Sequence, residues 1–100
     1  MVMSAVRNKI LAILRELMLL ISDTDEKRWL DYFGHVISLF ENGSHDSELI
    51  KILKKLLDNS LSSFSQLVLH GNGQVLIEQN EKLEFLRKAL SYECNEAQHS

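Results

Sequence analysis

The chain has 100 residues, of which 45% are hydrophobic and 25% are charged. This composition is typical of a folded globular protein and excludes a disordered chain. A net charge of −3 argues against general nucleic-acid binding, and the single cysteine, Cys94, excludes an internal disulfide. We therefore expect one domain over residues 1–94 with a flexible tail at 95–100, located in the reducing cytoplasm.

An amphipathic helix is predicted over residues 4–21. Apolar residues recur at helical spacing and define its inner face: Val6, Ile10, Ile13, Leu14, Leu17, Leu20 and Ile21. Arg15 and Glu16 divide the apolar run into two short pieces, each below the length of a signal peptide core or a membrane span. No membrane association is expected.

Two further helices are predicted before residue 58. Asp23 with Glu26 resembles a capping box that opens the second, and Asn42-Gly43 predicts a left-handed end for it. The inner side of the second helix is Trp29, Leu30, Phe33, Val36, Ile37 and Phe40. Ser44 or Asp46 is expected to cap the third helix. Its inner face is Leu49, Ile50, Ile52, Leu53, Leu56 and Leu57, with Lys51, Lys54 and Lys55 on the solvent side.

The helical period stops at a polar connector around residues 58–63. A β-hairpin is predicted over 64–77, with strands at 64–70 and 74–77, because Asn72-Gly73 suits a type I′ turn. This turn sets Leu69 opposite Leu76. A fourth helix is then expected to begin at Asn80 as its N-cap and to end near Cys94, with Leu83, Leu86, Leu90 and Cys94 inside. The fold class is therefore α+β, mostly α, with four helices and one hairpin between the third and fourth.

Side chains suited to catalysis or metal binding do not cluster in the sequence. The histidines at 35, 45, 70 and 99 lack metal-site spacing, and Cys94 has acidic neighbours, Glu93 and Glu96, that disfavour a reactive thiolate. The loop at 71–73 is too short to hold a phosphate, and three lysines on the third helix are too few to read DNA. We expect no enzyme, no metal, no cofactor and no nucleic-acid partner.

Some apolar residues lie off the predicted inner faces, as expected for a protein-binding surface. On the second helix the stripe Arg28, Tyr32, His35 and Leu39 mixes polar and apolar side chains. On the last helix Phe85 and Tyr92 point away from the inner row, beside Glu81 and Glu84. On the first helix Leu19 lies near the middle of the polar side, and Leu11 and Met18 lie on its flank. Packing inside the domain is the alternative for each set.

Residues 59–80 resemble a family of small, mostly uncharacterised bacterial domains. That family has a Gly-Gly-Met-Gly-Ser-Phe-Asn-Asp-Leu motif, an Asn-Gly turn, and Glu-Asn before a final helix. The matching residues are 59–67, with Phe64 and Leu67 in register, then Asn72-Gly73, and then Glu78-Gln79-Asn80. Asn59, Ser60 and Ser62 replace the family's glycines. The resemblance implies a protein similar to immunity proteins, which neutralise a toxin by binding it, and implies no catalytic residues.

The leading hypothesis is thus an immunity-type protein that binds a cognate bacterial toxin, and the alternative is a homodimeric structural or regulatory adaptor. Residues 58–100 carry six acidic side chains and three basic ones, which would suit a basic partner. The candidate partner-binding residues are Arg28, Tyr32, His35, Leu39, Glu81, Glu84, Phe85 and Tyr92.

Overall fold

The computed structural model describes residues 2–24, 26–43, 46–58, 64 and 66–99. These residues form four helices, α1 (Val2–Ser22), α2 (Arg28–Asn42), α3 (Asp46–Asp58) and α4 (Ile77–His99). An antiparallel hairpin of two short strands, β1 (His70–Gly71) and β2 (Gln74–Val75), lies between α3 and α4. The predicted class, mostly α with one hairpin in this position, is confirmed.

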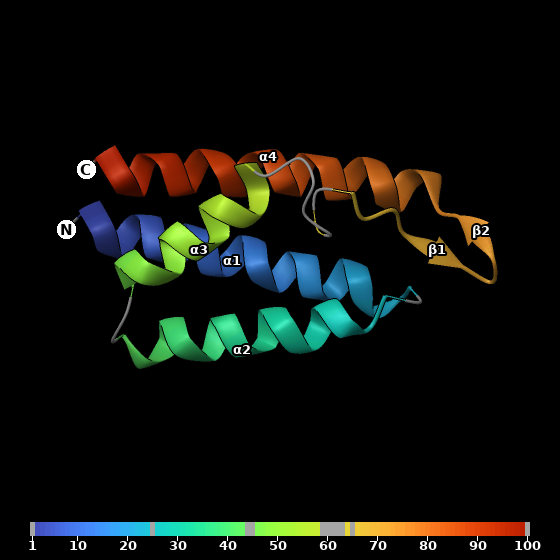
Figure 1. The fold of residues 1–100 in the computed structure, drawn as a ribbon, viewed down its shortest axis with the longest axis horizontal. Helices are drawn as coiled ribbons and strands as arrows, with labels where there is room; N and C mark the ends of the chain where they lie inside the picture. Colours follow the sequence, from blue (N-terminus) through green and yellow to red (C-terminus); the bar gives the residue numbers. More distant parts are fainter. Residues whose placement is uncertain (1, 25, 44–45, 59–63, 65, 100) are drawn as a thin grey trace.

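Helix α1 is the central element (Figure 1). It runs antiparallel to both α2 and α4 and packs against each of them, while the shorter α3 packs on α4 and also touches α2. The molecule is elongated, with extents of 44 × 24 × 20 Å, and the hairpin projects at the end opposite the two termini. Among the described residues, no helix combines the length and apolar character needed to cross a membrane.

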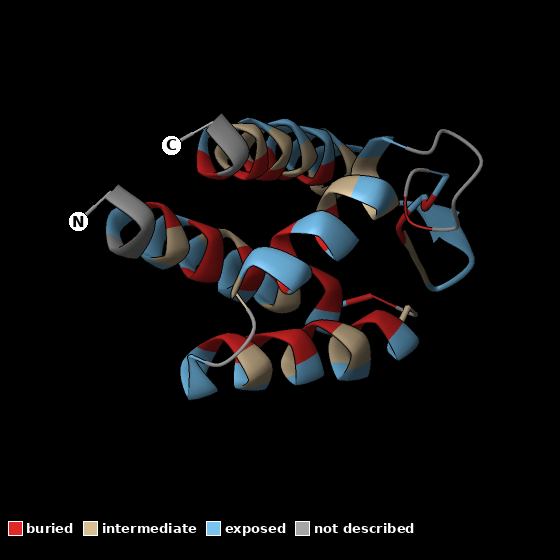
Figure 2. Cartoon of the chain, turned by 60° about the vertical axis from the view of Figure 1, so that its left-hand side comes forward, coloured by how far each residue is buried: buried red, intermediate tan, exposed pale blue. Residues whose placement is uncertain are grey.

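The buried sides of the helices face one another, as the red segments of Figure 2 show. All four residues of the inner row predicted for the last helix are buried. The predicted inner faces of α1 and α2 are confirmed, with Ile13 and Leu30 only half-buried at their margins. Ile52 was wrongly assigned to the inner face of α3, because it is 49% exposed. Leu11 is buried since α1 is covered on two sides, by α2 and α4.

The helix ends agree only partly with the predicted caps. Gly43 has a φ of 70° and ends α2 in the left-handed conformation, as predicted. The capping box at Asp23 is wrong: α2 begins at Arg28 after Lys27, whose side chain makes no capping bond. Instead, the buried Thr24 hydroxyl donates to the Ile21 carbonyl at 2.8 Å and accepts from the Glu26 amide at 3.2 Å. Thr24 thus closes α1, and α2 begins at Arg28.

The hairpin has the predicted turn and register but shorter strands. Asn72 and Gly73 have φ values of 53° and 77°, as a type I′ turn requires. His70 pairs with Val75, and the Leu76 amide donates to the Leu69 carbonyl at 3.0 Å. Each strand has only two residues, and Ile77, expected in the second strand, is the first residue of α4.

Helix α4 extends beyond both predicted ends. It starts three residues before Asn80, so Asn80 is not its N-cap, and it continues to His99. Residues 95–99, expected to form a flexible tail, are therefore helical, and Ala97 is buried in the core. Asp46 is the first residue of α3, whereas Ser44, the connector residues 59–63 and Ser100 lie outside the described residues.

Candidate functional site

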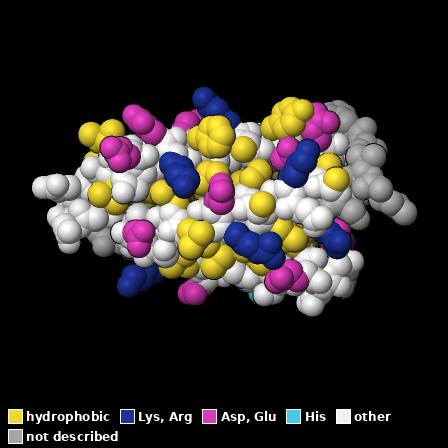
Figure 3. Space-filling model, turned by 180° about the vertical axis from the view of Figure 1, so that it is seen from behind, with side chains coloured by type: hydrophobic (Ala, Val, Ile, Leu, Met, Phe, Trp, Pro, Cys, Tyr) yellow, Lys and Arg dark blue, Asp and Glu magenta, His cyan; other side chains and the backbone are white. Residues whose placement is uncertain are grey.

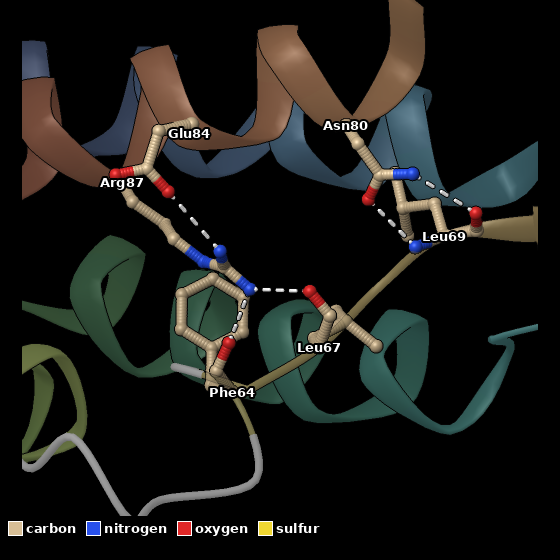
Figure 4. Close-up of polar contacts among 6 residues, drawn as sticks. All are labelled: Phe64, Leu67, Leu69, Asn80, Glu84 and Arg87. Atoms are coloured by element: carbon tan, nitrogen blue, oxygen red, sulfur yellow. Dashed lines mark hydrogen bonds and ion pairs between the residues drawn. The ribbon is translucent and has the colours of Figure 1, made fainter. Parts of the chain in front are cut away.

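The segment before the hairpin is held on α4 by the side chain of Asn80 (Figure 4). The Asn80 Nδ2 donates to the Leu69 carbonyl at 3.0 Å and to the Leu76 carbonyl at 2.8 Å. Its Oδ1 accepts from the Leu69 amide at 2.8 Å. The Asn80 amide thus takes the Leu69 N–H and the Leu76 carbonyl, two groups that would bond to each other if the β-ladder continued.

Arg87, seven residues after Asn80 on α4, makes a second attachment between this helix and the segment before the hairpin (Figure 4). Its Nη2 donates to the Phe64 carbonyl at 2.5 Å and to the Leu67 carbonyl at 2.8 Å. Its Nη1 pairs with Glu84 at 3.3 Å, and the guanidinium lies 5.2 Å from the centre of the Phe64 ring. Burial lowers the pKa of Arg87, an effect that Glu84 opposes. These contacts give Asn80 and Arg87 a structural role, in positioning Phe64, Leu67 and Leu69.

Two findings on the described residues concern metal binding and the cysteine thiol. These residues contain no group of three or more His, Cys, Asp or Glu side chains placed to hold a metal ion. Cys94 is buried, and burial, reinforced by Asp58 and Glu93 and opposed by Lys54, raises the pKa of its thiol to about 12. The thiol is therefore protonated at neutral pH, and a protonated thiol is a poor nucleophile.

The solvent side of α4 carries two predicted site residues that the core does not cover. Phe85 is 68% exposed and Tyr92 is 61% exposed. A spacing of seven residues places them within about 20° of each other around the helix. We call this surface the α4 outer face; it consists of Glu81, Glu84, Phe85, Lys88 and Tyr92, of which all are exposed. Figure 3 shows hydrophobic side chains standing among charges of both signs over α4 and α1.

The predicted stripe on α2 is covered more closely. Arg28 and His35 are exposed, whereas Tyr32 and Leu39 are half-buried and pack against the core. The Tyr32 ring lies 5.5 Å from that of Trp29, and burial raises the pKa of its hydroxyl. Because α1 lies between α2 and α4, the two predicted surfaces are not brought together into one site.

A groove that sequence reasoning missed lies between the end of α1 and the start of α4. Its volume is about 380 Å³, and its lining residues are Leu19, Leu20, Asp23, Glu78, Gln79 and Lys82. The contributing segments are more than fifty positions apart in the chain, so no local pattern could reveal it. The one available signal was Leu19, an apolar residue on the polar side of its helix, which is 72% exposed.

Comparison of the chain with protein-family models, curated proteins and solved structures gives no match. The class of protein established is thus a small four-helix domain with a hairpin.

Proposed function

We propose that this is an immunity-type protein, which neutralises a cognate bacterial toxin by binding it through the α4 outer face. The observation that carries the proposal is the exposure of Phe85 and Tyr92 on a helix whose opposite side already supplies a complete row to the core. Large aromatic side chains are enriched among the residues that dominate protein interfaces. Folding leaves most of their surface exposed, and a docked protein would bury it.

The charge around the aromatic pair indicates what kind of partner would fit. The exposed acids of α4 are Glu78, Glu81, Glu84 and Glu96, and its exposed bases are Lys82 and Lys88. Arg87 does not add to the exposed positive charge, because its guanidinium is turned inward to the Phe64 and Leu67 carbonyls. An acidic surface with aromatic anchors favours a basic partner through complementary electrostatics.

A homodimer formed by pairing two α4 outer faces is less consistent with the charges of this helix than a different, basic partner. An antiparallel pair of α4 helices can set Phe85 of each copy against Tyr92 of the other. In that register Glu81 faces Glu96, and like charges meet at both ends of the contact. Such repulsion works against a homodimer through this face. The hairpin also offers little edge for strand pairing between copies, because each strand has two residues.

Neutralisation of the bound toxin is what the resemblance of residues 59–80 to immunity-like domains implies.

A growth-rescue assay tests the proposal. Candidate toxins encoded next to the gene are expressed in a sensitive bacterial host with and without this protein, and growth is measured. We expect one of them to be neutralised, and the double variant Phe85→Ala/Tyr92→Ala to lose the rescue while remaining folded. Ile52→Ala is the matched control, since Ile52 is an exposed apolar residue on α3.

The oligomeric state separates this proposal from a homodimeric adaptor. Light scattering is expected to show that the protein alone is a monomer. When the toxin is added, it is expected to show a complex of one copy of each chain. A tight homodimer that dissociates on Phe85→Ala/Tyr92→Ala, together with failure to rescue growth, would contradict the immunity function.

The contribution of the acidic side chains of α4 to binding is tested by measuring the association rate with the toxin that this protein neutralises in the rescue assay. Glu81→Lys is expected to slow association and to weaken its dependence on salt, because electrostatic steering acts mainly on the association rate. Glu84→Lys is made separately, since Glu84 also pairs with Arg87. The control is Asp31→Lys on α2, an exposed acid remote from α4 in the fold. Equal association rates for Glu81→Lys and the unmodified protein would exclude an acidic docking face.

A further inference from the structure

We propose that the groove between α1 and α4 binds a basic side chain, arginine or lysine, together with an adjoining apolar residue of the partner. This inference rests on the proposed function, because the same docked protein would supply the segment. It adds a second contact, at one end of the α4 outer face, and it specifies the chemistry of the partner that occupies it.

The groove has room for a basic side chain and part of its apolar neighbour. Its volume of about 380 Å³ lies near the lower end of the range for binding pockets, roughly 300–1,000 Å³. Leu19, Leu20 and Asp23 line it from the end of α1, and Glu78, Gln79 and Lys82 line it from the first turns of α4. Glu78, Glu81 and Phe85 follow one another on successive turns of α4, so the groove continues into the α4 outer face.

The charges of the groove are unbalanced in favour of a cation. The last turn of α1 contains no basic residue, although the carbonyl end of a helix dipole favours positive charge. Asp23 follows directly and adds a full negative charge. The positive start of α4 lies at the same end of the molecule, but Glu78 in its first turn offsets it. Lys82 is the one cation in the lining, and no ion pair between described residues joins it to Asp23 or Glu78.

Leu19 supplies the apolar part of the recognition. It lines the groove and is 72% exposed, on the side of α1 that faces away from the core. Arginine and lysine carry long apolar stems that pack on such surfaces while their charged ends stay with polar partners. An apolar residue next to the basic one would cover the remainder of Leu19. The combination of Leu19 with two carboxylates therefore fits a basic segment better than an acidic or a purely apolar one.

The experiment uses the full chain and a defined peptide as the probe. The peptide acetyl-Ala-Leu-Arg-Leu-Ala-amide is titrated into the ¹⁵N-labelled protein, and amide chemical shifts are followed by NMR. We expect saturable shifts confined to residues 19–23 and 77–82, with a dissociation constant in the millimolar range. A peptide with neutral citrulline in place of arginine should bind at least about threefold more weakly, as the loss of an exposed charge pair implies.

Variants of the lining test each part of the recognition. Asp23→Asn/Glu78→Gln should abolish the preference for arginine over citrulline, and Leu19→Ala should weaken both peptides equally. Asp31→Asn, an exposed acid on α2, should change neither. Equal binding of the two peptides to the unmodified protein, or shifts that map to Phe85 and Tyr92 instead of the groove, would overturn this inference while leaving the proposed function intact. Failure of every candidate toxin in the rescue assay would instead count against the proposed function, whatever the peptides do.

Discussion

At the scale of single residues, the side chains of Asn80 and Arg87 form hydrogen bonds to backbone groups that a neighbouring strand would ordinarily satisfy. Backbone N–H and C=O groups withdrawn from water need hydrogen-bond partners. Here the Asn80 amide serves both backbone groups of Leu69, and the Arg87 guanidinium serves the carbonyls of Phe64 and Leu67. An asparagine before a helix ordinarily caps it, so the sequence predicted a local role for Asn80 where the structure shows a contact eleven residues away.

Arg87→Ala is predicted to destabilise the fold by about 2 kcal/mol, because it leaves two backbone carbonyls without their charged donor. The measurement is the free energy of unfolding from urea titration. Lys88→Ala, at the next and exposed position, is the control and should cost less than about 0.5 kcal/mol. Equal losses for the two variants would show that the Arg87 contacts do not stabilise the segment.

Cys94 gives the domain a pH-dependent stability above neutrality. Its pKa is about 12 in the folded protein and about 8.5 in an unfolded chain. The unfolded state therefore loses the thiol proton first, and stability contributed by the neutral thiol is complete below about pH 8.5 and declines as the pH rises toward 12. We expect the unfolding free energy of the unmodified protein to fall over this interval.

Cys94→Ala removes that titration and should show a shallower decline between pH 8.5 and 10, the part of the interval below the usual pKa range of tyrosine and lysine. A thiol reagent gives an independent readout: it should modify the native protein only at the rate of unfolding. Rapid modification of Cys94 under native conditions would contradict its burial.

At the scale of elements, periodicity predicted the helices well because each has a continuous apolar side. The rows of α2 and α4 could be identified from spacing alone, and the type I′ turn at Asn72-Gly73 fixed the hairpin register. The ends of elements were less predictable. Asp23 was expected to open α2, whereas Thr24 closes α1 and α2 begins at Arg28 without a side-chain cap. Ala97 is buried in the last turn of α4, whose polar sequence suggested a tail. These outcomes depend on tertiary contacts that no short window contains.

Two glycines should respond oppositely to alanine. Gly73 has a φ of 77° with open space around it, so Gly73→Ala should cost about 1 kcal/mol from backbone strain alone. Gly34 lies inside α2, and an added Cβ would meet the Met18 Cε at an ordinary contact distance of 3.6 Å. Gly34→Ala should therefore stabilise the protein by about 0.5–1 kcal/mol. Thermal and urea unfolding measure both; destabilisation of equal size at the two sites would contradict the account.

At the scale of the whole molecule, the central position of α1 decides which surplus apolar residues are used for folding. The sequence placed Leu11 on the flank of the first helix and Leu19 on its polar side; α2 and α4 cover the side bearing Leu11 and leave Leu19 outside. The same packing half-buries Tyr32 and exposes Phe85 and Tyr92. The candidate residues could thus be named from the sequence, whereas their separation into core and surface required the packing of the helices.

The most direct test of the account is a calorimetric measurement of how tightly two matched double variants bind the toxin that this protein neutralises in the rescue assay. Phe85→Ala/Tyr92→Ala removes the aromatic pair from the α4 outer face, and Arg28→Ala/His35→Ala removes the two exposed members of the α2 stripe. We expect the first to weaken binding by at least about tenfold with an unfolding free energy within about 0.5 kcal/mol of the unmodified protein, and the second to bind within about twofold. Unchanged affinity for the first variant, or a large loss confined to the second, would contradict the assignment of α4 as the docking surface.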